Sequence, residues 1–274
     1  MNYPNKLTTR QLYIEADIHS LGNYLRDLIH GDIVAIKIGK ALPAEQCKRV
    51  LENFENSKGM YVRTDGVPGR MVGVNTFLKN PSEILDSYVE HKAYSEMLFE
   101  GSENLFRLLF DCEEEAGYRV RNVYIRGVPA PTYRATVWAE QENPNHQVLK
   151  AHTDWPQVKY SQLEYSDVEN PIAINFYPSH PAKGTSILRI FDFIPSFQWL
   201  KQREIQHSGY PIPLKDLSQY SYFDIQPESG DIVLFNSNYV HTVFSSHEHN
   251  ACVRLNINGF MGYSPRANRI LHWA

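Results

Sequence analysis

The first third of the chain alternates between helical and extended patterns of apolar residues. One apolar run recurs at helical spacing and ends at Gly31, which predicts a helix; its members are Leu21, Leu25, Leu28 and Ile29. The β-branched segment 32–38 lies between two glycines and predicts a strand. Pro43 fits the first turn of a second helix, whose apolar face consists of Cys47, Val50, Leu51 and Phe54.

The next segment, 57–73, is polar and contains glycines, so we expect a loop there. Residues 81–117 predict two helices that are broken near Gly101 and Ser102. The apolar face of the second helix is formed by Leu105, Leu108 and Leu109.

Beyond Gly117 the pattern changes to short β-type runs that are separated by turn residues. Strands are predicted at 119–126, 133–140, 147–152, 171–177, 185–192, 221–226, 231–235, 241–245 and 252–262. This number of short strands with long connections favours an antiparallel double sheet of the jelly-roll kind. The fold class is therefore expected to be mainly β (α+β), with N-terminal helices packed on the core. The longest insertion, 195–217, is a candidate lid.

Length and composition indicate one domain, 1–274, with a helix-rich part (1–118) and a jelly-roll core (119–274). No Gly/Ser-rich or Pro-rich linker divides the 274 residues. The net charge is −4 and no run of Lys or Arg occurs, so we expect no nucleic-acid partner. No stretch is long and apolar enough to enter a membrane, and the first residues lack the apolar core of a secretion signal. Three scattered cysteines (Cys47, Cys112 and Cys252) are typical of free thiols in a reducing compartment, so we expect a cytoplasmic protein.

A candidate metal site begins at His152 and Asp154. Side chains two residues apart in an extended segment point to the same side, so this pair can present an imidazole and a carboxylate to one ion. A third ligand is available in His241, within the segment GDIVLFNSNYVHTV. Two histidines and one carboxylate on one face of an ion leave the opposite positions open. That set suits ferrous iron with a chelating co-substrate and dioxygen.

Arg254 follows His241 on the next predicted strand. Its guanidinium offers a planar pair of donors that matches a carboxylate. With Asn256 two residues later on the same face, Arg254 is a candidate anchor for the distal carboxylate of 2-oxoglutarate. Each feature alone has a plain structural alternative: a half-buried strand histidine for His241 and a surface ion pair for Arg254.

The order His-x-Asp, distant His and then Arg resembles the iron(II)/2-oxoglutarate-dependent oxygenases, whose fold is the double-stranded β-helix. Within that superfamily the chain is similar to the group that contains the cyanobacterial halogenases of hapalindole-type and welwitindolinone-type alkaloids. The similar segments are DIVAIKIGKALPAEQC, IAINFYPSHPAKGTSILRIFDF and the region from SGDIVLFNSNYVHTV to NGFMGYSPRANRILHWA. The resemblance implies Fe(II) as cofactor, with 2-oxoglutarate and O2 as co-substrates.

One departure from the halogenases affects the expected reaction. They have Gly where this chain has Asp154, and the vacated position takes chloride, so the resemblance implies hydroxylation here. The expected reaction hydroxylates an unactivated C–H of a small molecule, an alkaloid-like natural product or a free or modified amino acid, and releases succinate and CO2. Desaturation, cyclisation and epimerisation use the same kind of site. The rival interpretations are a non-catalytic cupin-like metal-binding module and a zinc hydrolase.

Several other residues have both a functional and a structural interpretation. Arg134 either helps to bind the co-substrate or forms a structural ion pair. Trp155, Asn175 and Phe176 either line a substrate pocket or pack in the core. Asn238 and Tyr239 either orient His241 or form a turn. The remaining histidines near the motifs are interpreted as solvated loop residues; they are His146, His247 and His249.

Overall fold

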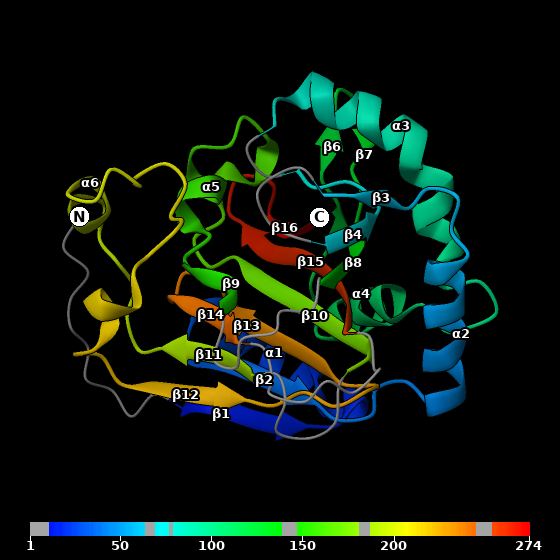
Figure 1. Cartoon of the computed structure of the whole chain (residues 1–274), viewed down its shortest axis with the longest axis horizontal. Coiled ribbons are helices and arrows are strands. Elements are labelled where there is room, and N and C mark those ends of the chain that lie inside the picture. Colours follow the sequence, from blue (N-terminus) through cyan, green and yellow to red (C-terminus); the bar gives the residue numbers. More distant parts are fainter. Residues whose placement is uncertain (1–10, 64–68, 77–78, 139–146, 181–186, 245–253) are drawn as a thin grey trace.

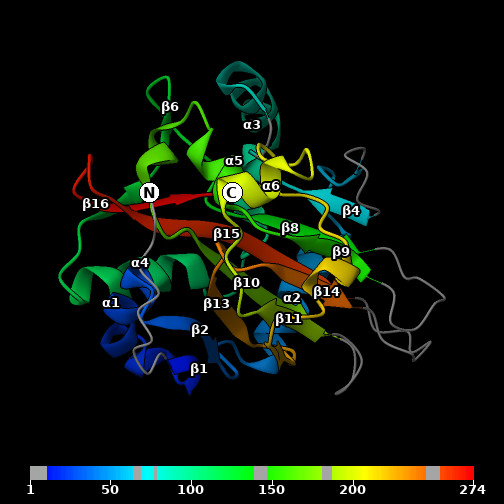
Figure 2. The same cartoon turned by 90° about the vertical axis from the view of Figure 1, so that its left-hand side faces the viewer.

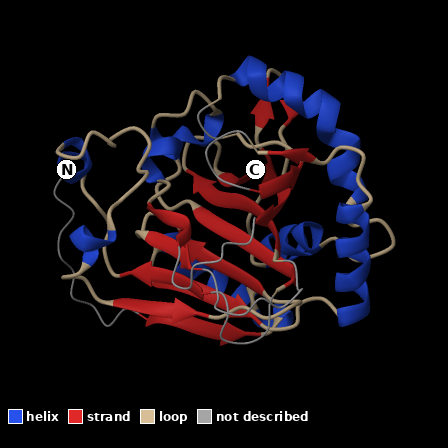
Figure 3. Ribbon diagram, viewed as in Figure 1, coloured by secondary structure: helices blue, strands red, loops and turns tan. Residues whose placement is uncertain are grey.

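Two β-sheets form the centre of the structure, and helices cover the outer face of the larger sheet (Figures 1 and 3). The computed structural model describes residues 11–63, 69–76, 79–138, 147–180, 187–244 and 254–274. None of the helices in these ranges combines the length and apolarity that crossing a bilayer requires. Cys252, His146, His247 and His249 lie outside the described residues.

The large sheet contains ten strands among the described residues, and most of them pair in an antiparallel manner. They are β1 (Gln11–Ala16), β2 (Ile33–Ile38), β3 (Tyr61–Val62), β4 (Gly69–Val72), β5 (Val120–Asn122), β8 (Arg134–Trp138), β10 (Ile172–Ser179), β13 (Ile232–Asn236), β15 (Leu255–Ser264) and β16 (Arg269–Trp273). Their order is β1-β2-β13-β10-β15-β8-β4-β3, with β16 and β5 branching from β15.

The small sheet has the order β12-β11-β14-β9. Its strands are β9 (Gln147–His152), β11 (Ile187–Phe191), β12 (Tyr222–Ile225) and β14 (His241–Phe244). From β8 onward the chain repeatedly crosses between the sheets, so strands that are neighbours in sequence face each other across the core. This arrangement is the double-stranded β-helix, or jelly roll, as the strand pattern predicted. A separate two-stranded hairpin pairs β6 (Tyr124–Ile125) with β7 (Val128–Pro129).

The helices begin and end where local sequence signals place them. They are α1 (Gly22–His30), α2 (Ala44–Glu55), α3 (Pro81–Met97), α4 (Leu105–Glu115), α5 (Trp155–Lys159) and α6 (Phe197–Lys201), with short 3-10 turns at Ile18–Ser20, Glu164–Asp167 and Leu214–Leu217. Gly31 ends α1 in the left-handed conformation (φ 82°). Asn80 and Glu83 form a capping box at the start of α3.

The two faces of β10 belong to different parts of the core. Ile172, Ile174 and Phe176 pack in the cluster that includes residues of α1, α2 and α4. Ala173 and Tyr177 belong to the cluster that includes residues of the small sheet. Because side chains alternate along a strand, Asn175 lies on the same face of the large sheet as Ala173 and Tyr177. This face is turned toward the small sheet, and we call it the inner face.

Two predictions about elements are wrong. The predicted loop 57–73 contains β3 and β4, and the predicted strand 119–126 is divided between β5 and β6. The strands β2 and β4, from the helix-rich part, belong to the same sheet as β8 and β15. The strands β1 and β16 were not predicted. A fully buried hydrogen bond between His272 and Glu113 (Nε2 to Oε2, 2.8 Å) joins β16 to α4.

The insertion 195–217 is attached to the segment that follows β9. Ile212 donates its N–H to the carbonyl of Ala151 (2.7 Å), and Thr153 donates to the carbonyl of Gly209 (3.2 Å). Gln157 also reaches the carbonyl of Ser208 (2.9 Å). These bonds fit a fixed wall better than an opening lid. Figure 2 views the molecule from the side that carries α6 and this insertion.

Candidate metal centre

His152, Asp154 and His241 converge on one point between the sheets. Their ligand atoms all lie within 4.8 Å of one another, and all three residues are buried. Asp154 Oδ1 lies 3.7 Å from His152 Nε2, and Asp154 Oδ2 lies 3.8 Å from His241 Nε2. Neighbouring ligands about 2.1 Å from an ion are separated by roughly 3 Å. A small inward movement of the three side chains would therefore bring their ligand atoms to coordination distance from one metal ion.

The fold explains why residues so distant in the sequence meet. His152 ends β9 and His241 begins β14, and these two residues are register partners in the small sheet. Asp154 follows two residues later, at the start of α5. Its backbone N–H donates to the carbonyl of Ser237 (3.0 Å), which ties the turn after β9 to the turn before β14.

Both imidazoles are held in one tautomer. His152 Nδ1 lies 2.8 Å from the carbonyl oxygen of Lys150, and His241 Nδ1 lies 2.9 Å from that of Tyr239. A carbonyl oxygen only accepts, so each Nδ1 carries the hydrogen and each Nε2 keeps its lone pair for a metal. Tyr239 thus orients His241 through its backbone, as an outer partner of a metal ligand often does.

The electrostatics of the site fit a cation. Burial lowers the pKa of His241 well below its usual range, with a further contribution from His152, so the imidazole is neutral at pH 7. Burial raises the pKa of Asp154, while His152, a hydrogen bond with Ser237 and the charge of Arg134 act in the opposite direction. A buried carboxyl group beside two imidazoles is the donor set that a divalent transition metal prefers.

Arg254 and Tyr177 form a second polar group on the inner face. Arg254 lies immediately before β15 and is 9% exposed. Its guanidinium carbon lies 5.8 Å from the centre of the Tyr177 ring. Burial raises the pKa of Tyr177, and the charge of Arg254 and a hydrogen bond between the two side chains oppose that effect. The anchor role predicted for Arg254 stays a prediction, and this contact places its side chain beside Tyr177.

The weaker candidates lie at different places. Asn175 and Asn256 meet on the inner face, where Asn256 Nδ2 donates to Asn175 Oδ1 (2.9 Å). Phe176 lies on the other face of β10 and stacks with Phe99 at 6.2 Å, so the prediction that it lines a substrate pocket is wrong. Trp155 donates its indole N–H to the carbonyl of Pro195 (3.2 Å) and packs with the insertion.

Asn238 secures the turn before β14. Its Nδ2 donates to the carbonyl of Glu169 (2.8 Å), and its carbonyl accepts from the Thr153 hydroxyl (2.7 Å). Sequence reasoning missed Tyr177 and also Tyr210, whose ring lies 5.8 Å from that of His152. The sequence could have indicated Tyr177, because this residue stands two positions after Asn175 and therefore faces the same side of the strand.

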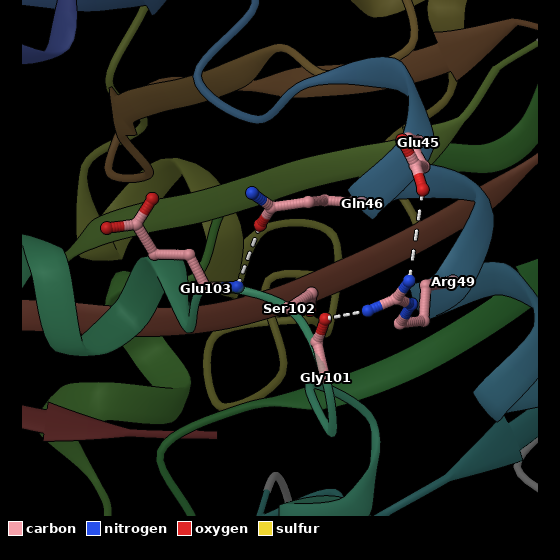
Figure 4. A pocket seen from close by; sticks show the side chains of 6 residues that line it. All are labelled: Glu45, Gln46, Arg49, Gly101, Ser102 and Glu103. Carbon is pink, nitrogen blue, oxygen red and sulfur yellow. Dashed lines mark hydrogen bonds and ion pairs between the residues drawn. The ribbon is translucent and has the colours of Figure 1, made fainter.

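A hollow of about 400 Å³ lies between α2 and the loop before α4, away from the inner face (Figure 4). Its polar groups bond to one another: Arg49 donates to the carbonyl of Gly101 and approaches Glu45, and Glu103 donates its N–H to Gln46. We assign it no function.

No family model and no curated protein matches the chain. Two solved structures resemble it over most of its length. The crystal structure of an N-substituted L-amino acid dioxygenase from Burkholderia ambifaria AMMD has a TM-score of 0.57 and 13% identity, and the similarity covers 93% of this chain and 91% of that chain. The non-heme alpha-ketoglutarate-dependent carbocyclase SnoK from nogalamycin biosynthesis has a TM-score of 0.51 and 12% identity, with 91% and 87% covered. At these identities the likeness establishes the fold of the chain, a double-stranded β-helix, and nothing beyond it.

Proposed function

We propose that the chain is an iron(II)- and 2-oxoglutarate-dependent oxygenase that hydroxylates an unactivated C–H of a small molecule. The observation that carries this proposal is the convergence of His152, Asp154 and His241 with both Nε2 atoms available as ligands. The two solved structures named above, which are described as a dioxygenase and an alpha-ketoglutarate-dependent carbocyclase, share the fold and support the same class.

In this proposal His152, Asp154 and His241 hold the iron, and Arg254 holds the distal carboxylate of 2-oxoglutarate. Bound iron would supply the activation of dioxygen, coupled to conversion of 2-oxoglutarate into succinate and CO2. The chain's own residues would bind and orient the iron and the 2-oxoglutarate and would shield them from solvent. Tyr177 steadies the Arg254 guanidinium, and the backbone carbonyls of Lys150 and Tyr239 keep both imidazoles in the ligating tautomer.

The carboxylate of Asp154 occupies a ligand position, which favours hydroxylation over halogenation. Desaturation, cyclisation and epimerisation use the same kind of metal site and depend on where the substrate carbon lies. The proposed substrate is either an alkaloid-like natural product or a free or modified amino acid, and the proposed location is the cytoplasm.

The test is anaerobic mixing of the protein with Fe(II) and 2-oxoglutarate, followed by visible spectroscopy. Chelation of the metal by the keto acid is expected to give a charge-transfer band that is absent with either component alone. Metal binding without that band would instead favour a metal-binding module. Hydrolytic activity with zinc and without oxygen would favour a zinc hydrolase.

A further inference from the structure

The turn between β13 and β14 presents three successive backbone carbonyls to groups of the metal site. The Ser237 carbonyl accepts the backbone N–H of Asp154 (3.0 Å). The next carbonyl, that of Asn238, accepts the hydroxyl of Thr153 (2.7 Å). The third, that of Tyr239, lies 2.9 Å from the Nδ1 of the histidine ligand that begins β14. One short turn therefore orients groups on both strands that carry the metal ligands.

This turn is held by the side chain of Asn170, which lies two residues before β10. Asn170 Oδ1 accepts hydrogen bonds from Asn236 Nδ2 (3.1 Å) and from Asn238 Nδ2 (3.2 Å). Its own Nδ2 donates to the carbonyl of Ile29 (3.1 Å), in the last turn of α1. A single amide thus joins the helical layer to the turn.

Backbone groups fix the orientation of all three amides. A carbonyl oxygen only accepts and an N–H only donates. The Nδ2 of Asn170 must therefore face the Ile29 carbonyl, and the Nδ2 of Asn238 must face the carbonyl of Glu169 (2.8 Å). Asn236 Oδ1 accepts the backbone N–H of Asn238 (3.1 Å), which turns its Nδ2 toward Asn170. Asn170 Oδ1 is thus the acceptor on which two side chains of the turn converge.

Loss of this acceptor would act on a buried part of the chain. Asn236 is 1% exposed and Asn238 is 7% exposed, and a buried donor that loses its acceptor is unfavourable. The backbone bond from Ser237 to the carbonyl of Pro171 (2.9 Å) would keep the turn attached to the sheet. We therefore expect the turn to shift rather than to unfold, and its three carbonyls would shift with it.

We infer that Asn170 is a positioning residue of the metal centre, because its Oδ1 fixes the turn whose carbonyls orient Asp154 and His241. Asn170 acts through the turn and is not itself a metal ligand. The inference rests on the metal site of the proposed function and adds a residue that lies outside the motif of the three ligands.

The test measures binding of Co(II) to the metal-free protein through its visible d–d absorption, whose shape reports the coordination geometry. Asn170→Ala should weaken Co(II) binding by about tenfold, the lower end of the usual effect of an outer partner, and should change the shape of the band. Asn170→Asp keeps the acceptor oxygen and loses the donor to Ile29. It should bind Co(II) nearly as tightly as the wild type, although its resistance to urea should fall.

Asn53→Ala is the matched control. Asn53, on α2, is also a partly buried amide, and its Nδ2 donates to the carbonyls of Leu98 (3.1 Å) and Glu100 (3.0 Å). This variant should lose stability to urea and keep the Co(II) affinity and band of the wild type. The unfolding equilibrium does not enter the dissociation constant while the metal-free protein stays folded, and far-UV circular dichroism before each titration checks that it does.

The inference is overturned if Asn170→Ala binds Co(II) as tightly as the wild type with the same band, or if Asn170→Asp loses as much affinity as Asn170→Ala. Equal weakening of Co(II) binding by Asn53→Ala would also overturn it, because a general loss of stability would then account for the effect. If Asn170→Ala does not fold, Asn170→Ser replaces it with the same expectation, since its side chain is too short to reach both amides. Failure of the wild type to bind Co(II) would count against the proposed function instead.

Discussion

His152 and His241 are paired across β9 and β14 with their ring centroids 4.1 Å apart, and each donates its Nδ1–H to the carbonyl two residues earlier in its own chain segment. The same local arrangement occurs at the last residue of β9 and at the first residue of β14. Both Nε2 atoms are thereby turned toward Asp154 by bonds to the backbone.

Replacing Asp154 with alanine should weaken iron binding and abolish hydroxylation. The loss in metal affinity should exceed the roughly 10–100-fold that removal of an outer partner costs, because a ligand atom itself is lost. Titration with Fe(II) under argon measures it. Asp224→Ala, which removes a partly exposed carboxylate, is the control. Hydroxylation at the wild-type rate in Asp154→Ala would show that the ligand assignment is wrong.

Arg254→Gln should raise the concentration of 2-oxoglutarate needed for half-maximal band formation by about tenfold or more, since a charge-assisted pair is lost. The Fe(II) requirement should change much less. Titrating each component in turn gives the two values. Equal increases in the 2-oxoglutarate and Fe(II) requirements would show that Arg254 does not anchor 2-oxoglutarate.

Gly209→Ala should destabilise the protein and weaken metal binding. Gly209 has φ +66°, and an added Cβ would lie 2.2 Å from the carbonyl oxygen of Thr153, the residue between His152 and Asp154. Backbone strain of this kind costs about 1–3 kcal/mol before any clash.

Gly127→Ala provides the matched control for that variant, because Gly127 also has a positive φ (+84°) but nothing within 4 Å of the added carbon. Urea unfolding should show a larger loss for Gly209→Ala than for Gly127→Ala. Equal losses of unfolding free energy in the two variants would mean that the backbone at Thr153 can move away from the added Cβ at little cost.

Cys47 should react slowly with iodoacetamide at pH 8. Burial raises the pKa of this thiol to about 11, and only the thiolate reacts. The thiolate fraction at pH 8 is therefore about one in a thousand, and the rate should rise about tenfold per pH unit until it levels off near pH 11. Mass spectrometry of native and urea-unfolded protein measures the difference. Rapid labelling of folded protein at pH 8 would contradict the burial of Cys47.

Glu113→Ala should destabilise the fold by about 3–5 kcal/mol, the typical cost of leaving one partner of a buried pair alone. Both Glu113 and His272 have fully buried side chains. The double variant Glu113→Leu, His272→Phe should recover part of the loss, because Phe110 already packs 4.1 Å from the His272 ring. Urea unfolding of both variants tests this, and additive losses would exclude coupling of the two side chains.

Much of the core could be predicted because its strands carry strong local signals. The predicted strand 147–152 is β9 itself, and the motif His152-x-Asp154 lies at its end. By contrast, β3 and β4 are short strands at the edge of the sheet, within a polar segment whose composition resembles a loop. The pairing of β4 with β8 is a tertiary effect that no local pattern reveals.

The error at Phe176 has a different origin. Asn175 and Phe176 are adjacent on one strand, so alternation allows only one of them to face the pocket. The register of β10 with β13 and β15 decides which of the two side chains faces the pocket. That register is not visible in a single sequence. The hydrogen bond between Asn256 and Asn175 depends on the same register.

The backbone bonds from 209 and 212 to Ala151 and Thr153 make the insertion, in effect, an added edge to the strand that ends in His152. A chimera that exchanged this insertion for a loop of another length would therefore be expected to displace the strand end that carries the metal ligand His152. New selectivity in this scaffold is therefore expected to arise by changing side chains on the existing wall, while the wall itself is retained.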